Sequence, residues 1–383
     1  MKIKVKPEDF VVEEIIDLPI SNSGPYTLLK LKKSFWNTLD VIDFVARKFS
    51  TAKEKFSRAG LKDRYSLSTQ YLTFRGEFKK IVKEKNFILT PIGWVSKPIL
   101  PGDLKGNRFS ITLRDLSENE IEKVYKNYSE ICNFGLPNYF DEQRFGSARH
   151  RKGFFAKLLM LGHYQGAMKL LLCYPYKEDG RKVKIFKKYC AEHWGDWTGS
   201  LSYSPFEFKK IILFLKDNPK DFKGAIKRID KDMLNLYLLA YQSYLFNEIL
   251  YRLIKKFGRE TIEVPYSVGS YLFYHKLLDK EEIFDLKIPM INEKIELKGK
   301  IGNIITEVLD QEGIGLKDFK LNKMRFRGVR FKSFLRPAII FPKDFSIGEA
   351  EQDEIYNNKK KMLIKFILPP GSYATILVKR LFI

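Results

Sequence analysis

The sequence predicts an α+β protein in which strands from both ends of the chain form one sheet and a largely helical segment is inserted between them. Three observations support this fold class. Short runs rich in β-branched and aromatic residues occur near the start of the chain and return from Arg336 onward. Residues from about 154 to 260 instead carry long apolar stretches with helical spacing. The chain has 383 residues, enough for two domains with separate cores.

The N-terminal part combines several strand patterns with one helix pattern. Residues 9–15 and 26–32 are predicted as strands because β-branched and apolar residues dominate them. Asn37 is the predicted N-cap of a helix whose apolar side includes Val41, Val45 and Phe49. Further strands are predicted from Leu67 and around Phe109, where apolar and polar residues alternate.

The clearest helix prediction begins after residue 117. Ser117 and Glu120 have the spacing of a capping box, and Gly135 provides a stop signal. One apolar face connects them, which predicts that this helix packs against a core. After the helical segment, the runs PAIIF, MLIKFIL and ATILVKRLF are dense in β-branched and aromatic residues and are predicted as strands.

The charge of the chain predicts a polyanionic partner. Lys and Arg number 69 against 46 Asp and Glu, a formal net charge of +23. Nucleic acid fits this surplus better than a membrane surface, because no apolar run approaches the roughly 18 to 20 residues that span a bilayer. The start, MKIKVKPEDF, lacks the apolar core of a signal peptide, so we expect a cytoplasmic protein.

The sequence predicts neither a metal nor a cofactor. Cys132, Cys173 and Cys190 form no CxxC pair, and we expect them to be buried thiols. Cys190 and His193 have a ligand-like spacing, but a structural zinc site needs a second pair. Phosphate-binding patterns of the GxxxxGK[ST] and GxGxxG types do not occur.

Asp63 is the candidate reacting group. It lies in FSRAGLKDRYSLSTQ, residues 56–70, in a predicted turn where Gly60 can supply a positive φ. The neighbouring cations Lys62 and Arg64 favour an ionised carboxylate, which can act as a nucleophile. The alternative is that Asp63 is a solvated turn residue or a helix cap, the commoner role of Asp in such turns.

Five segments decide between these alternatives, because together they resemble the D-type tRNA pseudouridine synthases, the TruD family. They are KVKPEDFVVEE at residues 4–14, AGLKDR at 59–64 with Thr69 and Gln70, LPNYFDEQRFG at 136–146, YQSYLFNEI at 241–249 and FILPPGSYATILVKRL at 366–381. In this family the Asp of the KD pair is the catalytic nucleophile. The resemblance implies a catalytic domain with a mixed or antiparallel sheet from residues 1–154 and 331–383. It also implies an inserted α/β TRUD domain at residues 155–330, with tRNA bound in the cleft between the two.

The resemblance further implies an isomerase that converts uridine to pseudouridine, at position 13 in the D stem of bacterial tRNA. That reaction needs an extruded base, a carboxylate near C1′ that acts as nucleophile or proton acceptor, and a pocket for the detached uracil. It needs no cofactor, and tRNA is the implied partner, with no membrane and no obligate protein partner. One alternative is a non-catalytic RNA-binding or ribosome-assembly factor on the same fold. Another is a metal-dependent nuclease, but the chain lacks a cluster of paired carboxylates.

Five further residues match positions of the family's pocket. Lys4 matches a cation that pairs with the catalytic carboxylate, and Phe10 matches a position that contacts the substrate nucleotide. Asn138 and Phe140 match the uracil-binding positions, where an amide recognises the base edge and an aromatic face stacks on the ring. Tyr373 matches an aromatic residue that the C-terminal segment brings to the pocket. The alternatives are a solvated terminus for Lys4 and inward-facing strand residues for Phe10 and Tyr373.

Two local features qualify the resemblance at residues 138–152. Phe140 lacks a hydroxyl, which excludes a phenolic proton transfer at this position, and Asp141 stands where the family commonly has Gly. A basic run follows, which we expect to contact RNA phosphates, although a solvated helix face would have the same composition. Its members are Arg144, Arg149, Arg151 and Lys152.

Overall fold

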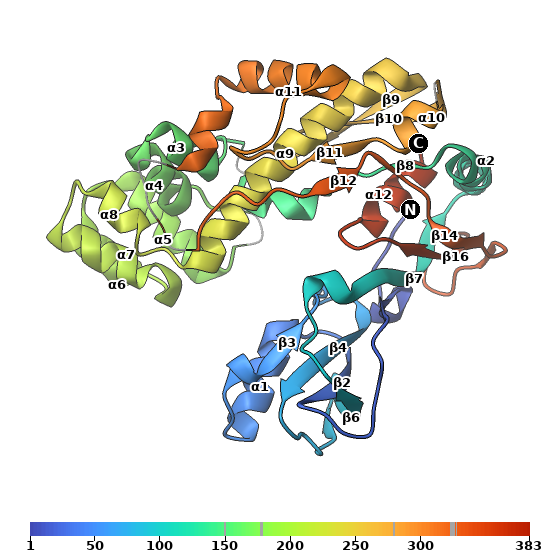
Figure 1. Ribbon diagram of the computed structural model, residues 1–383, viewed down its shortest axis with the longest axis horizontal. Coiled ribbons are helices and arrows are strands. Elements are labelled where there is room, and N and C mark those ends of the chain that lie inside the picture. The colour runs from blue at the N-terminus through green and yellow to red at the C-terminus, as the bar shows by residue number, and fades with distance from the viewer. Residues whose placement is uncertain (149–150, 177–178, 279, 322–325, 327) are drawn as a thin grey trace. The chain divides into compact units, whose positions relative to one another are not determined.

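The computed structural model describes residues 1–148, 151–176, 179–278, 280–321, 326 and 328–383, and it confirms the α+β class. The chain divides into two units (Figure 1). Residues 1–136 and 340–383 make the first unit, and residues 137–339 make the second. The insertion that the sequence predicts, residues 155–330, lies inside the second unit. The chain passes between the units at the short strands β8 (Leu136–Pro137) and β13 (Ile339–Ile340).

The first unit is built on a ten-stranded sheet to which both ends of the chain contribute, as predicted. Its main path is β14 (Lys343–Ile347), β16 (Lys360–Leu368), β7 (Leu104–Leu116), β1 (Phe10–Ile16), β4 (Leu67–Arg75), β2 (Tyr26–Lys33), β6 (Phe87–Val95) and β5 (Val82–Glu84). β15 (Glu351–Gln352) pairs with β16, and β3 (Phe56–Arg58) pairs with β4. β1 and β4 are parallel, whereas the other neighbours are antiparallel, so the sheet is mixed.

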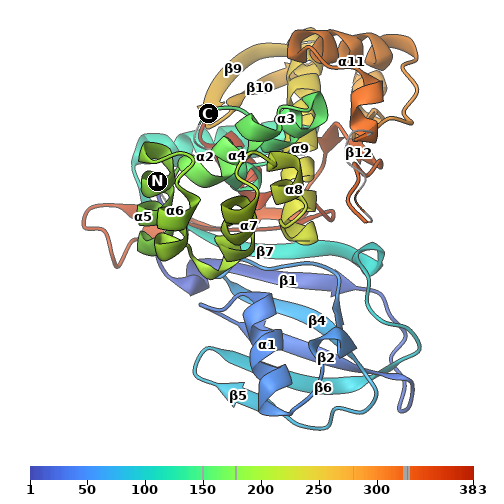
Figure 2. The ribbon, with the colours of Figure 1, turned by 90° about the vertical axis from the view of Figure 1, so that its left-hand side faces the viewer.

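Helix α1 (Thr38–Lys48) covers one part of this sheet (Figure 2). Val41, Ile42 and Val45 are buried in a cluster with apolar residues of β2, β4 and β6. The burial of Val41 and Val45 confirms the predicted apolar side of this helix. Asn37 occupies the N-cap position, but its amide donates a hydrogen bond to Asp40 Oδ2 at 2.8 Å and caps no backbone amide.

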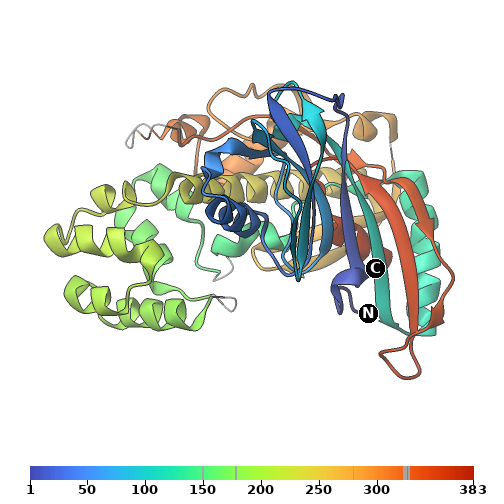
Figure 3. The ribbon, with the colours of Figure 1, turned by 90° about the horizontal axis from the view of Figure 1, so that it is seen from below.

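Helix α2 (Glu118–Phe134) has the predicted capping box. Ser117 Oγ accepts a hydrogen bond from the Glu120 amide at 3.3 Å, and Glu120 Oε2 accepts one from the Ser117 amide at 2.9 Å. Gly135 ends the helix with a φ of 72°, which glycine adopts without strain. Figure 3 shows α2 beside the β7–β16 part of the sheet, where Tyr128 donates a hydrogen bond to the carbonyl of Phe345 in β14 at 3.1 Å.

The prediction that ATILVKRLF is a strand is wrong. Residues Ala374–Leu381 form helix α12, which follows a turn with Gly371 at a φ of 80°. Leu377 and Leu381 are buried one helical turn apart, and Asn127 of α2 donates a hydrogen bond to the carbonyl of Leu381 at 2.9 Å. Packing against α2 therefore outweighs the strand preference of the β-branched residues.

After the 3-10 helix Glu142–Ala148, the described part of the second unit continues with six short helices, which we call the helical group. They are α3 (Phe155–Leu161), α4 (Tyr164–Cys173), α5 (Arg181–Glu192), α6 (Trp197–Tyr203), α7 (Phe206–Asp217) and α8 (Phe222–Ile226). They lie together beside the long helix α9 (Lys231–Phe257) (Figures 1 and 3). The helical character predicted for residues 154–260 is confirmed.

The rest of the second unit is a mixture of strands and helices. β9 (Gly258–Tyr266) and β10 (Gly269–Leu277) form an antiparallel hairpin that packs on α9. α10 (Lys280–Phe284), β11 (Lys287–Pro289), α11 (Gly299–Glu312) and β12 (Leu335–Pro337) follow, and β11 pairs with β12. Among the described residues, no helix is both long enough and apolar enough to cross a membrane.

Candidate active site

Asp63 lies on the loop that joins β3 to β4, and its side chain is 46% exposed. Its Oδ2 is 2.7 Å from Nζ of Lys4, which approaches from the N-terminal segment. The structure therefore brings together two residues that the sequence separates by 59 positions. Gly60 does not adopt a positive φ, so the expected reason for a glycine at this position is wrong.

The two cations beside Asp63 in the sequence have other partners. Lys62 Nζ lies 2.8 Å from Glu14 Oε1 and donates to Asn107 Oδ1 at 2.8 Å. Arg64 Nε donates to the carbonyl of Phe35 at 3.0 Å. The two neighbouring cations that were expected to favour the ionised carboxylate are thus held by other groups. The cation that pairs with Asp63 is Lys4.

Lys33 supports the loop from inside the first unit. It ends β2, is 1% exposed, and donates hydrogen bonds to the carbonyl oxygens of Asp63 at 2.9 Å and Lys62 at 3.3 Å. Burial lowers the pKa of the Lys33 ammonium to about 8, against a smaller raising effect of the Asp63 charge. Sequence reasoning missed this residue. The available signal was a lysine at an inward-facing position of an alternating strand.

A buried polar network fixes the base of the same loop. The Glu14 side chain is fully buried, and its Oε2 accepts a hydrogen bond from the Tyr71 amide at 2.9 Å while Oε1 pairs with Lys62. Thr38 Oγ1 donates to Gln70 Oε1 at 2.7 Å and accepts from the Lys62 amide at 3.3 Å. These contacts join Lys62 of the loop to β1, α1 and β4, which restricts where the loop can lie.

The segment that carries Lys4 is itself constrained. Lys4 has a φ of 58°, in the left-handed region that non-glycine residues seldom adopt. Its ammonium lies 4.2 Å from the centre of the Phe10 ring, which is 5% exposed and packs edge-on against Phe109. Phe10 therefore contacts the cation that pairs with Asp63. Strained backbone of this kind persists where the surrounding structure determines it.

Arg114 of β7 anchors the same segment. Its Nε donates to Asp9 Oδ1 at 2.9 Å, and its other nitrogens donate to Asp353 Oδ1 and Glu354 Oε1, each at 2.9 Å. Arg114, Asp9 and Asp353 are buried. Burial raises the pKa of Asp353, but hydrogen bonds from the Ile355 and Asp115 amides and from Arg114 outweigh it and lower that pKa overall.

Tyr373 lies in the first unit as well. It occupies the N-cap position of α12, it is half-buried, and its carbonyl accepts a hydrogen bond from the Ile376 amide at 3.1 Å.

Asn138 lies at the start of the second unit and is bound to Arg336. Arg336 donates to Asn138 Oδ1 and to the Asn138 carbonyl, at 2.6 and 2.9 Å. Asn138 Nδ2 donates to the carbonyl of Pro337 at 3.1 Å. The side chain that the sequence assigns to the base edge is thus 3% exposed and hydrogen-bonded within the protein.

Phe140 is packed close by in the same unit. Its ring is 3% exposed, with the Arg336 guanidinium carbon 4.2 Å from its centre and Phe246 edge-on at 5.3 Å. Asn247 holds the Phe140 backbone by donating to its carbonyl and accepting from its amide, both at 2.9 Å. Sequence reasoning missed Arg336, whose burial shows only in the structure. Asp141 is also buried and lies 3.4 Å from the Tyr271 hydroxyl.

The basic run after this motif is only partly described. Arg144 is half-buried in the 3-10 helix Glu142–Ala148, and its guanidinium lies 5.8 Å from the Phe140 ring centre. Arg151 and Lys152 are exposed, as phosphate contacts require. Arg149 lies outside the described residues.

No group of three or more His, Cys, Asp or Glu side chains suited to a metal ion occurs in the described part of the chain. Cys173 and Cys190 are buried, as expected, and burial raises the pKa of the Cys190 thiol to about 11. Cys132 is exposed, which corrects the expectation for that residue.

Comparison with known proteins agrees with the sequence motifs. The family model described as tRNA pseudouridine synthase D (TruD) matches residues 1–265 and 273–381. A protein of Methanocaldococcus jannaschii named for tRNA pseudouridine synthase D 2 is 37% identical, over 100% of this chain and 92% of its own length. The tRNA pseudouridine synthase D of Aquifex aeolicus is 30% identical, over 100% of this chain and 98% of its own. A crystal structure named for the same enzyme from Methanosarcina mazei superposes with a TM-score of 0.71 at 26% identity, covering 99% of this chain and 93% of that one.

Proposed function

The chain belongs to the tRNA pseudouridine synthase D family, a family of isomerases, and on that premise we propose that it converts uridine 13 in the D stem of tRNA to pseudouridine. Asp63 is the proposed nucleophile, and the proposed reaction uses no cofactor. We also propose a cytoplasmic location, as expected from the sequence.

The proposed chemistry requires one carboxylate at the sugar. Asp63 Oδ attacks C1′ of the extruded uridine, and the C1′–N1 bond breaks with its electron pair going to the uracil. The uracil then turns, its C5 bonds to C1′ as Asp63 leaves, and the proton on C5 is lost to solvent while N1 gains one. The atoms of substrate and product are therefore the same, which is why the reaction is an isomerisation.

The observation that carries this proposal is the ion pair between Lys4 and the exposed carboxylate of Asp63. The backbone of the loop that bears Asp63 is held by hydrogen bonds from the buried Lys33, one of them to the Asp63 carbonyl. Lys4 Nζ is 2.7 Å from Asp63 Oδ2, and the Asp63 side chain is 46% exposed. An acid on the surface with a rigid backbone can approach a flipped nucleotide without reorganising.

Phe10, Asn138, Phe140 and Tyr373 are the proposed substrate-binding residues. Contact of Asn138 or Phe140 with the base requires an exchange of partners, because Arg336 now occupies the amide of one and a face of the other. Base binding would therefore require Arg336 to move away from Asn138 and Phe140.

tRNA is the proposed partner, without an obligate protein partner. The exposed cations Arg151 and Lys152, together with Arg144 and Arg149, are the proposed phosphate contacts. The net charge of +23 supports a phosphate-rich ligand, whose affinity for the protein will fall as salt rises.

A non-catalytic RNA-binding factor is the second candidate, because it also accounts for the charge. Tritium release separates the two. We expect the protein to release tritium from tRNA that carries 5-³H-uridine, since the C5 proton leaves in the reaction. RNA binding without tritium release would support the binding factor, and strand scission would support a nuclease.

The variant Asp63→Asn tests the nucleophile. It should abolish tritium release while tRNA affinity stays within about tenfold, because phosphate contacts supply most of the affinity. Asp43→Asn is the control: its carboxylate is 47% exposed, close to the 46% of Asp63, and its contact with Lys53 is longer, at 3.9 Å. Substantial turnover by Asp63→Asn, or equal losses in both variants, would remove Asp63 from its role.

A further inference from the structure

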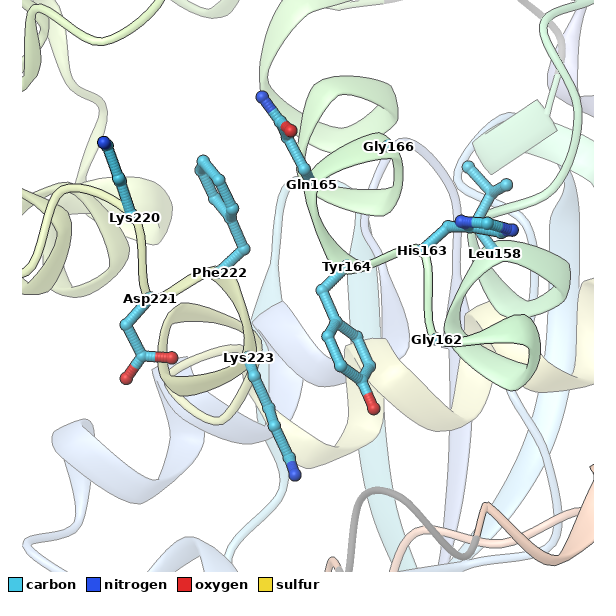
Figure 4. Close-up of a pocket in the computed structure, with 10 residues that line it drawn as sticks. All are labelled: Leu158, Gly162, His163, Tyr164, Gln165, Gly166, Lys220, Asp221, Phe222 and Lys223. Atoms are coloured by element: carbon cyan, nitrogen blue, oxygen red, sulfur yellow. The ribbon is translucent and has the colours of Figure 1, made fainter.

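Two adjoining hollows lie on the helical group of the second unit, with volumes of about 620 and 650 Å³. They share Gln165, Lys220 and Phe222 and together we call them the α4–α8 pocket. The first hollow lies between the start of α4 and the segment before α8, with Phe222 on one side and Tyr164 and Gln165 on the other (Figure 4). The second extends from Phe222 to the loop that carries Trp194.

Aromatic rings form one wall of the α4–α8 pocket. The Phe222 ring stacks on Trp194 with 5.7 Å between centres and an angle of 22°. Trp194 meets Trp197 edge-on at 4.9 Å. Trp197 is 3% exposed and its Nε1 donates to the carbonyl of Pro219 at 3.3 Å, whereas Trp194 and Phe222 are half-buried. A fixed indole thus supports two rings that still have exposed surface, an arrangement on which a planar group can stack.

The charge around these rings is positive. Lys220 and Lys223 line the pocket, and Lys169 Nζ lies 5.5 Å from the Trp194 ring centre. All three are exposed and none forms an ion pair with a described residue. Among the described residues, Asp221 is the one acid that lines either hollow, and its Oδ1 accepts a hydrogen bond from the Gly224 amide at 2.8 Å as the cap of α8. The pocket therefore suits an anionic ligand.

A polar group that can recognise a base edge is also present. The exposed amide of Gln165 has both donors and an acceptor, and Figure 4 shows it beside the Phe222 ring. The Tyr164 hydroxyl is shielded from solvent, and Figure 4 shows it directed away from Phe222 and Gln165, so we assign it no contact with the base.

We propose that the α4–α8 pocket binds an unpaired nucleotide of the RNA, with the base on the Trp194–Phe222 rings and its flanking phosphates against Lys220 and Lys223. Stacking rings bordered by cations are how proteins hold single-stranded nucleic acid, because every base has a face and every linkage has a charge. The inference rests on the proposed function in that tRNA is the ligand. It adds to the uridine at Asp63 a second nucleotide, held by the inserted part of the chain.

Three variants of the full-length protein test the proposal. Lys220→Gln with Lys223→Gln removes the charges, and Phe222→Leu removes the aromatic face while it keeps apolar packing against Trp194. The matched control is Lys209→Gln with Lys210→Gln, an exposed basic pair on α7 that lines neither hollow. Equilibrium affinity for a tRNA transcript is measured across a series of salt concentrations, and melting temperatures establish that each variant is folded.

The expected result is a loss confined to the pocket variants. Phe222→Leu should weaken binding by about 5- to 150-fold, the effect of removing one stacked base. The Lys220 and Lys223 pair should reduce the slope of log affinity against log salt by about 1.4, or about 0.7 for each lost phosphate contact on a single strand. The single-turnover rate at saturating tRNA should be unchanged, because neither change touches the reacting uridine.

Wild-type affinity in both pocket variants would overturn the proposal, and so would an equal loss in the Lys209 and Lys210 control. Its failure is distinguishable from failure of the proposed function. A protein that binds tRNA through the pocket but releases no tritium supports the pocket and contradicts the isomerase. A protein that releases tritium, and whose affinity for tRNA is the same in all variants, supports the isomerase and contradicts the pocket.

Discussion

The ammonium of Lys33 donates a hydrogen bond to the main-chain carbonyl of Asp63 at 2.9 Å, from a side chain that is 1% exposed. The same nitrogen donates to the Lys62 carbonyl at 3.3 Å. Lys33 thus holds the backbone of the Asp63 loop while Lys4 pairs with its carboxylate. Lys33 sets the position of the proposed nucleophile and Lys4 pairs with its charge, so variants of the two lysines can separate these effects.

Lys33→Met should slow the reaction without weakening tRNA binding. Methionine has a similar length and fills the buried space, but it donates no hydrogen bond to the loop. Hydrogen bonds from a charged group are worth about 1.5–3 kcal/mol, so we expect a single-turnover rate about 10- to 150-fold lower. Lys32→Met, on the exposed side of the same strand, is the control and should keep the wild-type rate. A wild-type rate in Lys33→Met would show that the hydrogen bonds from Lys33 to the loop do not contribute to the reaction.

The pH dependence of the rate gives a second test of Lys33. Burial lowers the pKa of this ammonium to about 8, below its ordinary 10.5, so the wild-type rate should fall as pH rises through about 8. Stability responds in the opposite direction. Between about 8 and 10.5 the unfolded chain binds the proton that the folded protein has released, so this group makes the folded state more stable as pH rises. If Lys33→Met shows the same fall in rate with pH, the fall is caused by the titration of another group.

Several strands and the start of α2 could be predicted from the sequence because their signals are local. Alternation predicted β7, and the Ser117–Glu120 spacing predicted the start of α2. Asp63 differs, because its turn alone also fits a solvated residue or a helix cap. The resemblance of five segments along the chain made it the candidate nucleophile, and that role stays a prediction.

The remaining features depend on contacts between distant segments. Helix α12 has the composition of a strand and becomes a helix where it packs on α2. Lys33 lies at an inward-facing position of its strand, but only the structure shows that it and Arg336 are buried and donate to carbonyl oxygens of remote segments. The direction of Lys62 likewise depends on Glu14, 48 positions earlier, and no local pattern carries that information.

Arg114→Met should destabilise the first unit by about 3–5 kcal/mol, because it leaves the buried carboxylates of Asp9 and Asp353 without their cation. Arg108→Met on the same strand is the control. Its guanidinium is 50% exposed and lies 3.5 Å from Asp344, and exposed pairs contribute about 1 kcal/mol or less. Thermal unfolding of both variants measures the difference. Equal melting temperatures would mean that the Arg114 cluster contributes no more than a surface ion pair.

Removal of metal ions should leave the activity intact. The proposed reaction requires a carboxylate and a base pocket, neither of which needs a divalent cation. Tritium release is therefore expected to continue in excess EDTA once the tRNA has been folded and the chelator added afterwards. A loss that zinc or magnesium restores, with the tRNA fold unchanged by structure probing, would contradict the cofactor-free reaction.

Phe140 can be tested for packing and for base stacking with one set of variants. Because its ring is 3% exposed, Phe140→Ala should lower stability by about 3–5 kcal/mol whether or not the ring contacts uracil. If the ring also stacks on the base, as proposed, the single-turnover rate per folded molecule should fall by about 5- to 150-fold. Phe140→Tyr keeps the ring face and should keep most of that rate, although a buried hydroxyl without a partner would cost about 1–3 kcal/mol of stability.

The control for this pair is Phe186→Ala in the helical group. Phe186 is fully buried and stacks on Phe208 at 5.2 Å, so its loss should lower the melting temperature much as Phe140→Ala does. It has no proposed contact with uracil, and the rate per folded molecule should therefore stay at the wild-type value. The distinguishing quantity is the rate corrected for the folded fraction, not the melting temperature. An unchanged corrected rate in Phe140→Ala would limit this residue to packing between Arg336 and Phe246 and would leave uracil recognition to other side chains.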